Sequence, residues 1–244
     1  MIEKIEGIII SEKDYSETSK ILNIITKNHG IIGVIAKGCK SLKSELRSVT
    51  GKLTYGYFNL YYKSGKLSPL ISVDVIDSFR AIKSDIRKIS YASFILDLTE
   101  QVMKQTHRED IYDLLIASLI KVNEGYDPMV IANILELKYL DYLGVMPIID
   151  ACAVCGATNS IATLSSNKGG YICNKCHKNE KIVSSKTIKM IRMFCYVEIA
   201  KISKLDISEQ VKREINSFLD EYYDQYTGLY LKSKTFLNNL NKIS

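Results

Sequence analysis

Four cysteines in two closely spaced pairs constrain this chain more than any other feature. Cys152 and Cys155 are separated by two residues, as are Cys173 and Cys176, and seventeen residues lie between the pairs. Each pair can present two thiolates from one tight turn, and two such turns form a tetrahedral S4 cage of the kind that zinc prefers. This spacing is typical of zinc sites. The sequence therefore predicts a zinc ion bound by these four cysteines.

Two other interpretations of the cysteine pairs remain open. An S4 iron centre of the rubredoxin kind uses the same donors and geometry. Two redox-active pairs would need a surrounding βαβ pattern, which neither pair has. Because four cysteine ligands leave no position for water or substrate, the metal is expected to be structural. Cys39 and Cys195 have no near partner in the sequence and are expected to be free thiols in a reducing compartment.

Positive charge is concentrated in one part of the chain. The 244 residues have a formal net charge of +6, and residues 27–66 hold eight basic side chains against the single acidic residue Glu45. The other 204 residues together have a formal charge of −1. This asymmetry indicates a surface for a polyanion such as nucleic acid. The alternative is a solvated lysine face that maintains solubility.

The first 80 residues contain five segments with the β-branched and aromatic composition of strands. These segments are 2–11, 20–26, 31–37, 55–63 and 67–75. Gly30 supplies a hairpin turn after the second segment, and Gly7 is a candidate bulge. A basic stretch with room for a short helix at 42–49 follows the third segment, which predicts an OB-fold barrel. Such barrels bind single-stranded nucleic acid with a basic groove and with aromatic side chains, which residues 55–63 could supply.

From about residue 82 the apolar period lengthens to about 3.6 residues, which predicts helices. The helical segments are 82–105, 111–122, 127–144, 184–202, 208–226 and about 230–241. The predicted fold is therefore α+β with two domains. An N-terminal five-stranded OB-fold barrel covers residues 1–80, and a helical domain with a four-cysteine zinc hairpin inserted at about 150–178 covers residues 81–244.

The sequence carries no motif of a familiar enzyme. It has no phosphate-binding G-x-x-x-x-G-K-[ST] or G-x-G-x-x-G loop and no His-x-Glu of the zinc deaminases. His29 is expected in a turn, His107 at the surface and His177 beside the cysteines, and none has the context of a nucleophile elbow. The sequence therefore predicts that the protein is not an enzyme. No segment is apolar for long enough to span a membrane, so a cytoplasmic protein is expected.

Several stretches together resemble the RecO family of bacterial recombination mediator proteins. They are DYSETSKIL at 14–22, KNHGIIGVIAKG at 27–38, Gly56-Tyr57-Phe58, LELKYLDYLGVMP at 135–147, the four cysteines and LKSKTFLNNL near the C-terminus. The resemblance covers nearly the whole chain, and the order and spacing of the stretches make it specific. It implies an OB barrel, a helical domain and a zinc hairpin of the kind that many family members carry.

The resemblance also implies a function in DNA repair by homologous recombination. Members of the family bind single- and double-stranded DNA and anneal complementary strands without ATP. With RecR and the acidic C-terminal tail of the single-stranded DNA-binding protein (SSB), they help load RecA onto SSB-covered strands. The family's basic loop matches residues 37–41, where Cys39 departs from the basic or small residue expected. The candidate DNA-binding residues are Lys37, Lys40, Lys43, Arg47 and Lys52.

Two further interpretations compete with DNA binding. The helical domain and the zinc hairpin could form a scaffold for partner proteins, with a barrel that does not contact DNA. A zinc-dependent hydrolase is the third interpretation, and it would require an open coordination position on the metal. The family resemblance implies a protein that lies in the cytoplasm in association with the nucleoid.

Overall fold

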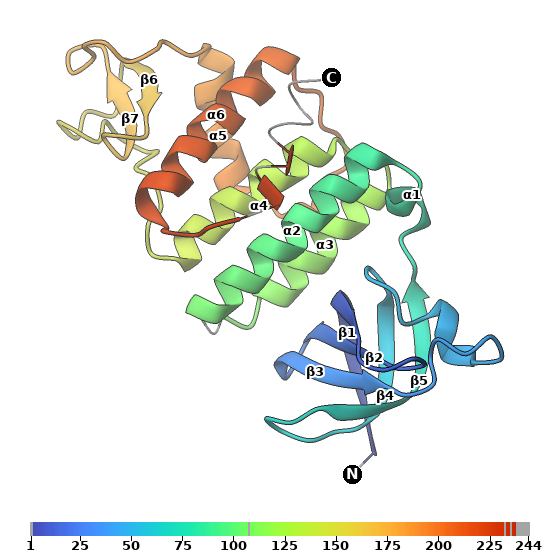
Figure 1. Ribbon diagram of the computed structural model, residues 1–244. Helices are drawn as coiled ribbons and strands as arrows, with labels where there is room; N and C mark the ends of the chain where they lie inside the picture. The colour runs from blue at the N-terminus through green and yellow to red at the C-terminus, as the bar shows by residue number, and fades with distance from the viewer. Residues whose placement is uncertain (1, 107, 232, 235, 238–244) are drawn as a thin grey trace.

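The structure of the protein is a computed structural model that describes residues 2–106, 108–231, 233–234 and 236–237. A β-barrel lies at one end, a layer of helices in the middle and a small two-stranded hairpin at the other end (Figure 1). The prediction of an α+β protein with an N-terminal barrel, a helical domain and an inserted cysteine hairpin is therefore confirmed.

The N-terminal part of the chain is a closed five-stranded barrel. Its strands are β1 (Ile2–Asp14), β2 (Lys20–Thr26), β3 (Gly30–Ala36), β4 (Tyr55–Tyr61) and β5 (Ser68–Asp77). They follow the order β1-β2-β3-β5-β4, with a parallel pairing of β3 with β5 and antiparallel pairings elsewhere. This is the OB-fold arrangement. The short helix expected at 42–49 is the 3-10 helix η1 (Glu45–Ser48).

The strand β1 is buried on both of its faces. Ile5 and Ile9 belong to the core inside the barrel, whereas Ile8 and Ile10 belong to a second core that continues into the helices. A strand covered on both sides reads as a continuous apolar run rather than as an alternating one. The run of isoleucines at 8–10 therefore marks the place where the barrel meets the helical domain.

Gly7 is not the bulge that the sequence predicts, because β1 changes register between Ile9 and Ser11. Gly7 has another purpose, since a Cβ added there would lie 2.7 Å from the Ile25 carbonyl oxygen. At Gly56 an added Cβ would lie 2.5 Å from the Asp74 carbonyl oxygen. Both glycines therefore allow neighbouring strands to approach closely.

The rest of the described chain is mostly helical. The helices are α1 (Arg80–Lys83), α2 (Ile86–Gln105), α3 (Ile111–Asn123), α4 (Pro128–Tyr142), α5 (Ser185–Tyr196), the 3-10 helix η2 (Ile199–Lys201) and α6 (Glu209–Tyr226). The segment predicted as one helix at 82–105 is divided, because Asp85 accepts hydrogen bonds from the Arg87 and Lys88 N–H groups and so begins α2. His107 and half of the helix predicted at about 230–241 lie outside the described residues, and residues 233–234 and 236–237 of that segment are helical.

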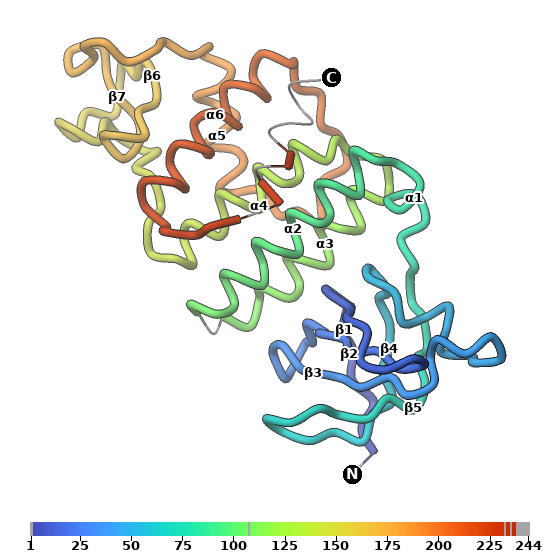
Figure 2. The backbone as a smooth tube through the Cα atoms, in the orientation of Figure 1, coloured from blue at the N-terminus to red at the C-terminus, as the bar shows by residue number. Residues whose placement is uncertain are grey.

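The helix α4 lies at the centre of this domain and packs against α2, α3, α5 and α6 (Figure 1). Its residues are buried nearly all round, as expected of a helix enclosed by others. The chain reaches the helices from β5 through a short connection (Figure 2), where Phe79 is fully buried in the shared core. Within the described ranges no helix is long and apolar enough to cross a membrane.

We expect the substitution Gly56→Ala to lower the free energy of unfolding by about 1–3 kcal/mol, because the new methyl group would force β4 away from the backbone of β5. Gly51→Ala is the matched control, since an added Cβ there meets nothing within 4 Å. Urea unfolding of both variants measures the difference. Equal stability of the two variants would show that the close approach at Gly56 is not a constraint.

Candidate metal centre and nucleic-acid interface

The four predicted cysteines meet at one end of the small hairpin formed by β6 (Ile161–Ser165) and β7 (Gly170–Cys173). All four sulfur atoms lie within 4.8 Å of one another, and Cys155 Sγ is 3.7 Å from Cys173 Sγ. In a tetrahedral S4 site with metal–sulfur bonds of about 2.3 Å, the sulfurs are about 3.8 Å apart. The cluster therefore fits one tetrahedrally coordinated metal ion.

The backbone around the cluster favours thiolates. Burial would raise the pKa of Cys152, but N–H groups of Cys173, Cys155 and Val154 point at its sulfur and lower the pKa to about 6. Cys176 behaves in the opposite way, because its contacts with the neighbouring sulfurs, Cys155 first, raise its pKa to about 12. A divalent cation between the sulfurs would hold all four as thiolates.

The hairpin is joined to the helical domain by specific hydrogen bonds. The Tyr171 hydroxyl donates to the Ile188 carbonyl oxygen on α5, and the Tyr171 N–H donates to the Ile148 carbonyl oxygen at 2.8 Å. His177, expected beside the cysteines, places Nε2 2.8 Å from the Glu180 carbonyl oxygen. It is not part of the cluster of possible ligands. The metal centre is therefore built from cysteines of the hairpin and fixed to α5.

All five predicted DNA-binding residues lie in the segment between β3 and β4. Lys37, Lys43 and Arg47 are exposed, whereas Lys40 forms a 2.8 Å ion pair with Asp14. We call Lys37, Lys40, Lys43 and Arg47 the basic loop. It is attached to the β1–β2 loop, because the Lys40 N–H donates to the Thr18 carbonyl oxygen at 2.9 Å and the Gly38 N–H to Ser19 Oγ at 3.3 Å.

Lys52, the fifth predicted residue, lies apart from the basic loop. Its ammonium group donates to Ser93 Oγ on α2 at 3.3 Å. Burial lowers the pKa of Lys52, whereas nearby acidic groups of α2 act in the opposite direction. This lysine therefore faces the helical domain, an environment that its position in a basic stretch did not indicate.

The structure also separates the aromatic residues of β4. Phe58 is fully buried, whereas Tyr57 and Tyr61 are 37% and 49% exposed on the outer face of the barrel. Sequence reasoning missed Tyr15, which is 61% exposed in the β1–β2 loop and so lies on the loop that is hydrogen-bonded to the basic loop. Nothing local in the sequence marks this neighbourhood, because it depends on how two separate loops pair.

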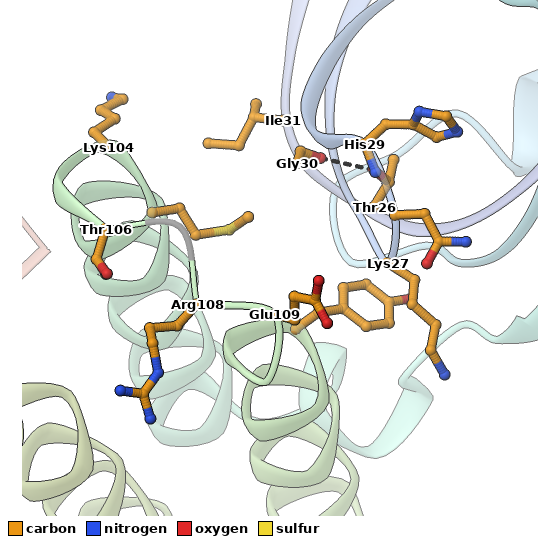
Figure 3. Close-up of a pocket in the computed structure, with 12 residues that line it drawn as sticks. Thr26, Lys27, His29, Gly30, Ile31, Lys104, Thr106, Arg108 and Glu109 are labelled. Atoms are coloured by element: carbon orange, nitrogen blue, oxygen red, sulfur yellow. Dashed lines mark hydrogen bonds between the residues drawn. The ribbon is translucent and has the colours of Figure 1, made fainter. Parts of the chain in front are cut away.

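A cleft of about 510 Å³ lies between the β2–β3 turn and the junction of α2 with α3 (Figure 3). Figure 3 shows Lys27 on the barrel side and Lys104 and Arg108 on the helical side. The sequence did not connect these basic residues, because they are far apart along the chain. Each has a carboxylate close by: Lys27 lies 3.8 Å from Asp113, Lys104 2.9 Å from Glu100 and Arg108 3.6 Å from Asp110. Carboxylates therefore neutralise the cations of the basic loop less than they neutralise the three cations of the cleft.

Comparison with known proteins identifies relatives over the full length of the chain. The family models "Recombination protein O N terminal" and "Recombination protein O C terminal" match residues 1–79 and 83–235. The protein named DNA repair protein RecO of Listeria monocytogenes is 35% identical, with 99% of this chain and 96% of the relative covered. Its namesakes in Bacillus pumilus and Halalkalibacterium halodurans are 34% and 31% identical, with all of this chain and 96% and 97% of those relatives covered.

We expect Cys155→Ser to remove most of the bound metal and to lower the melting temperature of the protein, because a hard hydroxyl replaces one of four thiolates. Cys195→Ser is the control, since Cys195 lies on α5 and is not part of the cluster. Metal analysis and thermal unfolding of both variants provide the measurement. Full metal content in Cys155→Ser would contradict the four-cysteine site.

Proposed function

Because this chain belongs to the RecO family of recombination proteins, we propose that it is a DNA repair protein of homologous recombination that binds single- and double-stranded DNA through its basic loop. The observation that carries this proposal is the exposure of three cations on one loop of an OB barrel. Lys37, Lys43 and Arg47 form no ion pair among the described residues. Cations that no carboxylate neutralises are available to phosphates.

In a complex with a single strand, the basic loop would contact phosphates and Tyr15 would contact a base. Each basic side chain that contacts a phosphate releases condensed counterions, which favours binding at low salt. The exposed ring of Tyr15 offers a platform on which a base can stack. OB folds bind oligonucleotides with their β1–β2 and β4–β5 loops. Tyr15 lies on the β1–β2 loop, and the basic loop is hydrogen-bonded to that loop. Tyr57 and Tyr61 lie on another face and are not required by this arrangement.

Binding of this kind supports strand annealing without ATP. A protein that neutralises phosphates lowers the repulsion between complementary strands and raises their local concentration. No bond has to be made or broken, so we propose that the protein is not an enzyme. It would act in the cytoplasm on nucleoid DNA, with RecR and the SSB tail as partners in loading RecA onto SSB-covered strands.

The metal in this proposal is a structural zinc ion. Four cysteine sulfurs complete a tetrahedral coordination sphere and leave no position for a substrate. The residues that would hold zinc are Cys152, Cys155, Cys173 and Cys176. An iron ion would fit the same sulfurs, and metal analysis of the purified protein distinguishes the two.

A zinc-stabilised scaffold that does not bind DNA is the competing function. It is favoured by the tight attachment of the hairpin to α5, which would suit a rigid docking element. Fluorescence anisotropy with labelled oligonucleotides separates the two proposals. Binding at micromolar concentrations or tighter supports the DNA function, whereas the absence of binding supports the scaffold.

A salt titration tests the role of the basic loop. Three phosphate contacts, by Lys37, Lys43 and Arg47, predict a slope of log affinity against log salt of about −2.1 on single strands. Lys37→Glu/Lys43→Glu should reduce the steepness of this slope by about 1.4 or more, because two contacts are lost. Lys189→Glu/Lys204→Glu, which changes two exposed lysines of the helical domain that form no ion pair among the described residues, is the matched control. An unchanged slope in the loop variant would rule out the loop as the binding site.

Tyr15→Ala tests the proposed stacking. Base–aromatic stacking contributes about 1–3 kcal/mol per base, so the affinity for single strands should fall by about 5- to 150-fold. Duplex affinity should change little, since paired bases do not expose their faces. Tyr61→Ala, a similarly exposed tyrosine on the outer face of the barrel, is the control. Equal losses on single strands and duplex would contradict stacking by Tyr15.

A further inference from the structure

The four cysteines of the candidate metal centre differ in their access to solvent. Cys152 and Cys173 are each 2% exposed and Cys176 is half-buried, whereas Cys155 is exposed. Cys173 is the last residue of β7, and its N–H donates to Cys152 Sγ at 3.4 Å, which holds these two cysteines against the hairpin. Solvent can therefore reach the centre at Cys155.

The exposed cysteine also has a second sulfur in contact with its own. Cys155 Sγ lies 3.7 Å from Cys173 Sγ, which belongs to the other cysteine pair. Cysteines that respond to oxidants are accessible to solvent and lie beside a second cysteine that can resolve the oxidised sulfur into a disulfide. Cys155 and Cys173 together meet both conditions.

The chain around the second cysteine pair is electropositive. Residues 168–192 carry seven basic side chains against the single acidic residue Glu180. Lys175 lies between Cys173 and Cys176 in the sequence and is exposed, and Lys168 Nζ donates to the Cys176 carbonyl oxygen at 3.4 Å. Reactive cysteines are found in electropositive and partly exposed surroundings of this kind.

The two cysteines outside the centre lack these conditions. Cys39 is 1% exposed and belongs to the core inside the barrel. Cys195 lies on α5, where burial raises the pKa of its thiol to about 12. Because the thiolate is the reactive form, this thiol stays protonated and inert at neutral pH. Oxidation of the folded protein is therefore directed to the metal centre.

We propose that Cys155 is the site at which a peroxide oxidises the metal centre, so that Cys155 and Cys173 form a disulfide and the zinc ion is released. This inference rests on the zinc ion of the proposed function. Hydrogen peroxide and one proton convert the Cys155 thiolate to a sulfenic acid and water. The Cys173 thiolate then attacks this sulfur, and the hydroxyl group leaves as water with a second proton. The two sulfurs lose the two electrons that the peroxide gains.

The oxidised centre cannot keep its metal ion. Only Cys152 and Cys176 remain as thiolates, whereas a structural zinc site has four ligands. The hairpin stays joined to α5, because the hydrogen bond from Tyr171 to the Ile188 carbonyl oxygen does not involve the cysteines. The basic loop lies on the barrel, at the opposite end of the molecule (Figure 1). Oxidation should therefore act on the hairpin alone, and a dithiol reductant with zinc should reverse it.

A zinc-release experiment tests this proposal. The full-length protein is loaded with zinc under reducing conditions, freed of reductant and treated with hydrogen peroxide, while a chromogenic chelator follows the released metal. The wild type should release its zinc, and peptide mapping should find a disulfide between Cys155 and Cys173. Cys155→His should keep zinc, since three cysteines and one histidine form a structural site. Peroxide should release this zinc about tenfold more slowly or less, because the exposed thiolate is gone and the others are less accessible.

The matched control is Cys176→His, which places the same imidazole at the half-buried ligand and should release zinc at the wild-type rate. Equal rates in Cys155→His and the wild type would overturn the proposal, as would a first disulfide that excludes Cys155.

A second measurement applies if Cys155→His does not hold zinc. A reagent specific for sulfenic acids, added to the wild type during oxidation, should label Cys155, and a label on another cysteine instead would overturn the proposal. Zinc that stays bound in the presence of peroxide contradicts this inference alone. Absence of zinc from the protein purified under reducing conditions would contradict the metal of the proposed function and this inference with it.

Discussion

The burial of β1 on both faces is the constraint on which the rest of the structure depends. Ile9 faces the interior of the barrel, whereas Ile8 and Ile10 pack into the core shared with the helices. Full burial of each side chain contributes about 1.5–3 kcal/mol, so the barrel cannot separate from the helices without a large loss of stability. Glu6 also joins the two domains, because its carboxylate accepts hydrogen bonds from Tyr55 of the barrel and Tyr112 of α3.

Features of the fold that have a local signal could be predicted from the sequence, whereas contacts between distant parts of the chain could not. The strand segments, the turn at Gly30 and the start of α4 at Asp127 each carry a local sequence signal, although the pairing of β1 with β4 and of β3 with β5 joins distant residues. The cysteine pairs are equally local, because two residues separate the members of each pair, and the structure brings all four together. The prediction of Gly7 as a bulge was wrong, because its close approach to β2 is a contact between strands that no local pattern records.

Charge was the property that the sequence revealed least completely. Lys52 lies in a basic stretch of the sequence, yet its ammonium group donates a hydrogen bond to Ser93 of α2, because the barrel packs against the helices. Lys104 and Arg108 approach Lys27 only because the barrel is docked on the helices. Residues 168–192 carry seven basic side chains against one acidic residue, and a sum over the whole helical domain cancels this local excess. Counting charge in windows of about 25 residues would have found them, whereas their exposure required the structure.

The candidate metal centre, the lysines next to it and the basic loop are held in place by different parts of the structure. Four thiolates on one ion would fix the turns of the hairpin, and Lys175 lies between two of them in sequence, so its position depends directly on the metal. Lys186 and Lys189 depend on α5, which is anchored independently by Ile191 and Phe194 in the helical core. The basic loop depends on neither, because it is held by the β1–β2 loop. Loss of the metal would thus displace Lys175 and leave Lys186, Lys189 and the basic loop in place, as expected of a structural ion.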